Sequence, residues 1–224
     1  MDTFRKFWTI IIALVIILSS GAGCKGYFSD FSDVKSNEGF RTLTVNNELC
    51  SFSMEYPESY KREGPYVDLD YVRPYTDVHL LSPKKSMELL VPANKDSLKT
   101  VTSGYVPASF LVEVYDTRNS PTVSYNANGR LENDIVDNAE WENFELLERL
   151  PVTVSGMEGE LIAYVVDWFI PIPRGEGPLL QYHQAVYFDH NGLIWVIEAT
   201  AEMGMVDQVK ADFEHILKTF KIMD

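Results

Sequence analysis

Histidine, cysteine and closely spaced carboxylates are the side chains of this sequence that could carry out catalysis or hold a metal. The four histidines are far apart along the chain, and they belong to no His-Glu-x-x-His motif or cysteine–histidine set of the kind that binds zinc. The sequence also has no Gly-x-Ser-x-Gly or Gly-x-x-x-x-Gly-Lys motif. It therefore predicts a chain that is not an enzyme and that has no metal or cofactor. The histidines are His79, His183, His190 and His215.

Two groups of carboxylates have alternative interpretations. Asp68 and Asp70 are two residues apart on an expected strand, so they could face the same way as a catalytic pair. Two solvated strand residues explain them equally well. A denser acidic set on and after an expected helix does not have the order of a calcium loop, so a solvated helix face is the preferred interpretation. This set is Glu132, Asp134, Asp137, Glu140, Glu142, Glu145 and Glu148.

Cys24 is the residue for which a specific reaction is expected. A basic start is followed by an apolar core over residues 7–18 and by small residues up to Cys24. This order is typical of a secretory signal peptide. The final residues resemble the lipobox of bacterial lipoproteins. The resemblance implies that signal peptidase II cleaves between Gly23 and Cys24, and that Cys24 then carries a diacylglycerol.

The leader (residues 1–23) leaves other interpretations open. Residues 7–23 carry no charge, so the segment could remain as an uncleaved membrane anchor. It could also be an ordinary signal cleaved near Ala22, or a buried helix of the domain. A diacylated cysteine supplies the two acyl chains needed for stable anchoring. The expected location is therefore the cell membrane, with a lipid-anchored chain that faces outside the cytoplasm.

Composition limits what the exported part can bind. The 224-residue chain has a net charge of −14, and removal of the leader makes it one unit more acidic. This charge argues against nucleic acid as a partner, because nucleic-acid binding requires a clustered basic surface. It also argues against broad adhesion to anionic lipid head groups. With Cys24 acylated, Cys50 has no cysteine partner in the chain and is expected to be a buried, inert thiol.

The pattern of apolar residues predicts one α+β domain over residues 40–224, preceded by a polar tether over residues 24–39. A helix is expected over 131–142, and an amphipathic helix of about 14 residues begins near Met205. An Asn-Gly step supports a hairpin around residues 189–192, and residues 155–158 are a second hairpin signal. Strands are expected at 41–45, 50–56, 66–72, 77–81, 87–91, 108–115, 144–154, 159–167, 181–188, 193–200 and 219–222.

A proline-rich aromatic segment is the candidate binding rim. Apolar side chains that run into an irregular loop can form the edge of a binding site, although packing under a long loop is the commoner explanation. The residues of this rim are Trp168, Phe169, Ile170 and Ile172.

Two short motifs connect the domain to a family. Phe52-Ser53-Met54-Glu55-Tyr56-Pro57, with Tyr60 close behind, is similar to the opening strand of PsbP-like domains. The end of the chain, Ile216-Leu217-Lys218-Thr219-Phe220, is similar to their closing helix and strand. By the order of its elements the resemblance covers residues 40–224. It implies an α-β-α sandwich around a central antiparallel sheet, and non-catalytic roles in assembly, scaffolding or partner binding.

Three hypotheses for function follow. The first is a membrane-anchored, non-catalytic domain that binds a protein partner or assists a membrane complex. The second is a binding protein for a small apolar or lipid ligand held between sheet and helix, which an open apolar cavity would favour. The third is an extracytoplasmic hydrolase, which convergent reactive groups in a cleft would favour. A closed core with an exposed apolar or acidic patch would favour the first.

Overall fold

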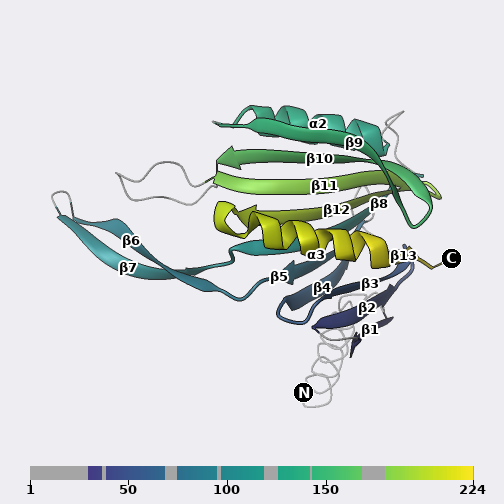
Figure 1. Ribbon diagram of the computed structural model, residues 1–224, viewed down its shortest axis with the longest axis horizontal. Coiled ribbons are helices and arrows are strands. Elements are labelled where there is room, and N and C mark those ends of the chain that lie inside the picture. Colours follow the sequence, from purple (N-terminus) through teal and green to yellow (C-terminus); the bar gives the residue numbers. More distant parts are fainter. Residues whose placement is uncertain are drawn as a thin grey trace, which may run out of the picture.

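A seven-stranded antiparallel sheet organises the computed structural model of this protein (Figure 1). The structure describes residues 30–36, 39–68, 75–94, 97–118, 126–141, 143–167 and 180–223. From one edge to the other, the strands of this large sheet are β4 (Lys61–Asp68), β5 (Tyr75–Leu81), β8 (Ala108–Asp116), β12 (Leu193–Glu202), β11 (Leu180–His190), β10 (Met157–Asp167) and β9 (Glu145–Val154).

A smaller sheet and two helices cover the large sheet. Helix α2 (Ala127–Ala139) lies over β10, β11 and β12 on one face. Helix α3 (Val206–Thr219), which follows a single 3-10 turn, η1 (Met203–Met205), packs between β12 and the small sheet on the opposite face. In order, the strands of the small sheet are β1 (Asp30–Lys35), β2 (Phe40–Asn46), β3 (Ser51–Pro57) and β13 (Lys221–Ile222).

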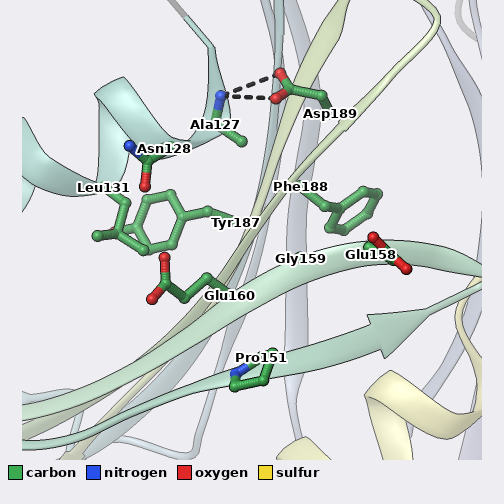
Figure 2. A pocket seen from close by; sticks show the side chains of 10 residues that line it. All are labelled: Ala127, Asn128, Leu131, Pro151, Glu158, Gly159, Glu160, Tyr187, Phe188 and Asp189. Carbon is green, nitrogen blue, oxygen red and sulfur yellow. Dashed lines mark hydrogen bonds between the residues drawn. The ribbon is translucent and has the colours of Figure 1, made fainter.

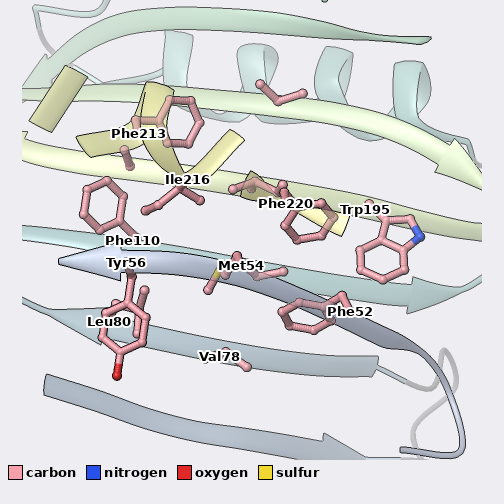
Figure 3. Close-up of a cluster of buried hydrophobic side chains, with 14 of the residues drawn as sticks. Phe52, Met54, Tyr56, Val78, Leu80, Phe110, Trp195, Phe213, Ile216 and Phe220 are labelled. Carbon is pink, nitrogen blue, oxygen red and sulfur yellow. The ribbon is translucent and has the colours of Figure 1, made fainter. Parts of the chain in front are cut away.

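The main hydrophobic core fills the space between the large sheet, the small sheet and α3 (Figure 3). Alternation along β8 and β12 directs Phe110 and Trp195 into this space, and each is 1% exposed. Phe110 stacks on Phe213 of α3, with ring centroids 6.4 Å apart. Phe52 of β3 meets Trp195 edge-on at 5.8 Å and stacks on Phe220 at 5.5 Å. Because each aromatic ring buries a large apolar area, this layer supplies much of the hydrophobic stabilisation.

The predicted α+β class is confirmed in its general form. Strands dominate the chain, and a central antiparallel sheet has a helix on each face. The expected sandwich of helices around a sheet needs correction on the α3 face. There the small sheet shares the cover with α3, because apolar residues of β2 and β3 enter the same core. The arrangement is therefore sheet-dominated rather than a simple three-layer α-β-α sandwich.

Both hairpins expected in the last third of the chain are present, with two-residue turns. Asn191 and Gly192 join β11 to β12 with φ of 51° and 74°. Ser155 and Gly156 join β9 to β10 with φ of 54° and 82°. Two consecutive positive φ values match the right-handed twist of the flanking strands. The second turn is tighter than the four-residue loop predicted over 155–158, so β10 begins at Met157.

Several predicted boundaries were wrong. The first helix begins at Ala127 rather than at residue 131, because Asn126 caps it by accepting from the Gly129 N–H at 2.8 Å. Strand β4 begins at Lys61 rather than at 66, since a register shift between Glu63 and Tyr66 carries the pairing past Gly64. Residues 30–35, assigned to the tether, form β1 and pair with β2.

A two-stranded ribbon, here called the arm, projects from the body of the molecule (Figure 1). It consists of β6 (Lys85–Asn94) and β7 (Ser97–Tyr105), which pair with each other in their own sheet. Only β6 was partly expected, over 87–91. At the base of the arm, Lys85 forms an ion pair with Glu202, and the Tyr105 hydroxyl donates to the same carboxylate at 2.8 Å.

The structure contains two long helices, α2 and α3, within the described ranges. Neither combines the length and the apolar character that a membrane-spanning helix needs.

Candidate binding surface at the α2 edge of the sheet

The outer edge of the large sheet carries a group of exposed apolar side chains. Strand β9 is the last strand of this sheet and lies alongside α2 (Figure 1). Leu146 and Leu147 on β9 are 41% and 48% exposed, and Val136 and Trp141 on and after α2 are 61% and 45% exposed. We call these four residues, with the acidic side chains around them, the α2 edge.

Arg149 links the helix to the strands at this edge. Its Nε donates to Glu160 Oε1 of β10 at 2.5 Å, and its Nη2 donates to Glu132 Oε1 of α2 at 2.8 Å. The hydrogen bonds to Glu160 and Glu132 raise the pKa of Arg149 above its usual value. The guanidinium therefore holds α2 in position over the edge of the sheet.

The same contact brings the middle of α2 close to β9, where Val136, Leu146 and Leu147 are all exposed. Leu146 pairs with Tyr164, which belongs to the core under α2, so Leu146 faces the α2 side of the sheet. The pairing then skips Leu147, which is the extra residue of a β-bulge. These exposed apolar side chains therefore lie in one region of the molecule, between α2 and the edge strand.

A cavity of about 360 Å³ opens between the first turn of α2 and strands β9 to β11 (Figure 2). Both carboxylate oxygens of Asp189 accept from the Ala127 N–H, at 3.0 and 3.1 Å. Burial raises the pKa of Asp189, and the hydrogen bond from Ala127 partly offsets this. Glu158 and Glu160 add two further carboxylates to the lining. This volume is near the lower limit for ligand pockets, and its acidic lining does not suit an apolar ligand.

A polar network lies between α2 and the sheet beyond this cavity, beside an apolar cluster that includes Leu131, Ile162 and Ile194. The Arg130 Nε donates to Asp134 Oδ2 at 2.9 Å, and the Tyr187 hydroxyl donates to the same oxygen at 3.0 Å. Arg130 also lies 3.9 Å from Glu113 Oε2 of β8 and stacks over the Tyr115 ring. Burial raises the pKa of both Glu113 and Asp134. Because these groups bond to one another, they orient the helix rather than form a reactive set.

The histidines have structural partners. His183 Nδ1 is 2.7 Å from Glu198, and its ring stacks on Tyr164 at 4.7 Å. His215 Nε2 is 2.9 Å from Glu55, so it ties α3 to β3. His79 is paired with Asp77 at 3.4 Å, and His190 Nδ1 is 3.1 Å from the Met157 sulfur. Among the described residues, no group of three or more histidine, cysteine or acidic side chains is placed to hold a metal ion.

Cys50 is buried, and burial raises the pKa of its thiol to about 12, as the sequence predicted for an inert cysteine. Several other predicted residues lie outside the described part of the chain. They are Gly23 and Cys24, the rim residues Trp168, Phe169, Ile170 and Ile172, and Asp70 and Glu142.

Sequence reasoning did not find the α2 edge. It assigned the acidic set to a solvated helix face, and it interpreted residues 144–154 as an ordinary strand. The available signal was the pair Leu146-Leu147, which breaks the period-two alternation of a half-buried strand. The register shift between Ala163 and Tyr164 on β10 marks the same place in the structure.

No protein-family model matches the chain, and no curated protein matches it. Solved structures with a similar arrangement were found at low sequence identity. Cyanobacterial PsbP (CyanoP) from Synechocystis sp. PCC 6803 gives a TM-score of 0.45 at 12% identity, over 90% of this chain and 96% of that one.

Two further structures are similar over most of their length. LpqN of Mycobacterium tuberculosis, described as involved in cell envelope biogenesis, gives a TM-score of 0.41 at 11% identity, over 88% of this chain and 92% of that one. PA94 of Pseudomonas aeruginosa, a protein of unknown function, gives a TM-score of 0.35 at 10% identity, over 82% of this chain and 91% of that one.

Proposed function

We propose that this protein is a membrane-anchored, extracytoplasmic lipoprotein with a PsbP-like domain, which acts without catalysis by binding a protein partner at the α2 edge. The anchor is the diacylated Cys24 expected from the leader. The domain presents the α2 edge to the partner.

The observation that carries this proposal is an exposed apolar patch beside a filled core. The space between the large sheet and α3, where a small apolar ligand would be held, is occupied by the side chains of Phe110, Phe213 and Ile216, each 1% exposed. The patch of Val136, Leu146 and Leu147 instead faces solvent at the edge of the sheet. Apolar patches rimmed by polar residues are typical of protein interfaces.

The charges and the backbone of the α2 edge indicate which kind of partner it would bind. The exposed face of α2 around Val136 carries Glu132, Asp137 and Glu140, so the helix side of the patch is acidic. Strand β9 ends the sheet, and an edge strand offers backbone hydrogen bonds to an added strand. An extended segment with apolar and basic side chains satisfies both the backbone and the side chains of the α2 edge.

The proposal is tested by recovering the full chain from native membranes with its bound proteins. The Leu147→Asp variant puts a charge in the centre of the patch and should lose the partner. The matched control is Met203→Asp, because Met203 is 50% exposed but lies on the 3-10 turn before α3. Recovery of the same partner with Leu147→Asp would contradict the proposed site.

Mass spectrometry of the N-terminus in the same preparation tests the anchor. We expect diacylglycerol on Cys24, and we expect Cys24→Ala to lose membrane retention with an unchanged fold. An unacylated native Cys24 would contradict the lipoprotein part of the proposal.

A further inference from the structure

Another cavity, of about 240 Å³, opens at the end of the large sheet. It is lined by the connection between β2 and β3, the turn between β11 and β12, the residue Arg118 that follows β8, and the end of β13. Among the described residues that line it are an arginine and a histidine but no carboxylate, unlike the cavity beside α2. In a chain with a net charge of −14, this lining favours an anion over a cation.

The indole nitrogen of Trp195 is a buried donor at the wall of this cavity. Trp195 is 1% exposed, and among the described residues its Nε1 has no hydrogen-bond acceptor. Figure 3 shows this nitrogen on the side of the indole that points away from the rings of Phe52 and Phe220. An indole nitrogen can only donate, and a buried donor without an acceptor costs free energy. An acceptor that enters the cavity would remove this cost.

The guanidinium of Arg118 is held at the same cavity by Asp116. Arg118 Nε and Nη2 donate to the two carboxylate oxygens at 2.9 and 2.8 Å, and the Arg118 backbone N–H donates to one of them at 2.9 Å. Asp116 is 7% exposed, and the hydrogen bonds from Arg118 lower its pKa. A guanidinium has five N–H groups in a fixed fork. Arg118 therefore retains N–H groups for a second acceptor.

The turn between β11 and β12 leaves room for the Arg118 stem. A Cβ on Gly192 would lie 2.5 Å from Cγ of Arg118, so a larger residue in this turn would displace the stem. The backbone N–H and the hydroxyl of Thr117 both donate to the Gly192 carbonyl, at 3.2 and 2.9 Å. These contacts position Arg118 before any ligand binds.

We propose that this cavity binds a small organic acid. Its carboxylate accepts from Trp195 Nε1 and from Arg118, and its short apolar body packs on Leu193 and Ile222, which also line the cavity. A carboxylate suits these donors because charge-assisted hydrogen bonds are roughly twice as strong as neutral ones. The volume is below the range of about 300–1,000 Å³ for drug-sized ligands, which limits the acid to a few carbon atoms. The site is separate from the α2 edge and adds ligand binding to the proposed function.

An NMR titration of the full-length chain in detergent tests this inference, with butanoate as the probe. The chain has four tryptophans, so labelling the indole nitrogens with ¹⁵N gives few signals, and Trp195→Phe identifies the one from Trp195. We expect butanoate to shift the Trp195 signal to saturation and to leave that of Trp141, which is 45% exposed, in place. Butanamide keeps the carbonyl but has no charge, and it should bind at least about tenfold more weakly.

Variants of Arg118 test the second donor. Arg118→Met keeps an apolar stem without the guanidinium, and it should weaken butanoate binding by at least about tenfold. The matched control is Lys218→Met, which removes a positive charge from the exposed surface of α3 and should leave the affinity unchanged. Each variant must keep the melting temperature of the wild type. If Arg118→Met does not, Arg118→Lys replaces it, because lysine keeps the charge but loses the fork and should also weaken binding.

Three outcomes would overturn the inference. They are a Trp195 signal that butanoate does not move, equal affinities for butanoate and butanamide, and binding that is insensitive to both Arg118 variants. The titration does not depend on the α2 edge, so Leu147→Asp should leave it unchanged. An intact titration without any partner at the α2 edge would contradict the proposed function alone, and the reverse result would contradict this inference alone.

Discussion

On the α3 face of the large sheet, Phe110, Trp195 and Phe213 are at most 1% exposed. On the α2 face, the helix packs on a smaller cluster that includes Ile162, Ile194 and Val196, and a polar network of Arg130, Asp134 and the Tyr187 hydroxyl lies beside it. The same sheet thus separates a large aromatic core from a smaller apolar cluster with a polar network. The larger core on the α3 face is expected to supply more of the stability. The α2 face can therefore expose apolar and acidic groups at its edge without unfolding the domain.

The largest effect is expected from truncating a buried side chain in the core on the α3 face. Phe213→Ala removes a ring that stacks on Phe110 and leaves a cavity in a filled core. We expect a loss of about 3–5 kcal/mol in the free energy of unfolding. Urea unfolding followed by circular dichroism measures it, and a loss below about 1 kcal/mol would show that this core is not the main source of stability.

The equivalent change on the α2 face should cost less and act locally. Leu131 is 0% exposed, but the cluster around it is smaller than the main core and has a solvated edge beside it. We expect Leu131→Ala to cost about 2–3 kcal/mol, near the lower end for such truncations. Hydrogen exchange should speed up in α2 and leave the amides of α3 unchanged. Equal acceleration in both helices would contradict the separation of the two faces.

Much of the α3 face could be predicted from the sequence, whereas on the α2 face the helix and strands could be predicted but the start of the helix and the exposed edge could not. Alternation of Phe52, Met54 and Tyr56 identified a core strand, and the spacing of Val209, Phe213 and Ile216 identified the helix that covers it. These signals are local and periodic. The start of α2 depends on Asn126, which is a local cap, and on Asp189, which is 62 residues further along the chain and is marked by no local pattern.

The α2 edge was missed for a related reason. Leu146 and Leu147 have the composition of core residues, and only the order of strands shows that β9 is an edge. The second strand of the arm was missed because residues 97–105 are mostly polar and do not alternate.

A smaller effect is expected at the start of α2. Asp189→Ala removes the carboxylate that accepts from the Ala127 N–H. Loss of such a cap costs about 1 kcal/mol, and thermal unfolding of the variant measures it. Asn126→Ala removes the other cap and is the matched comparison. If Asp189→Ala were as stable as the wild type, the polar attachment of α2 would have to lie elsewhere.

The smallest effect is expected in how the stability of the two faces depends on pH. Burial raises the pKa of Asp134 and Glu113 above their ordinary values of 3.8 and 4.5. Between those values and the folded pKa, the native state binds more protons than the unfolded state, so the stability contributed by these groups falls as pH rises. Protection of α2 amides, corrected for intrinsic exchange, should therefore increase as pH is lowered from neutrality through the folded pKa values of these groups.

The stability contributed by Asp33 on β1 is expected to depend on pH with the opposite sign. Burial raises the pKa of Asp33, but hydrogen bonds from Arg41 and Tyr56 outweigh this effect and lower it. Its contribution to stability is therefore present above its ordinary value of 3.8 and is lost as pH falls through the folded pKa. Asp134→Asn should reduce the pH response of α2 and leave that of β1 and β2 unchanged. An α2 response that does not depend on Asp134 would contradict this account.

Photo-crosslinking from single positions in native membranes tests the central claim most directly. A photoreactive residue at Leu147 reports on the α2 edge, and the same residue at Glu214 reports on the exposed surface of α3. We predict a specific adduct with a partner protein from position 147, identified by mass spectrometry, and none from position 214. Equal adducts from both positions, or none from position 147, would contradict partner binding at the α2 edge.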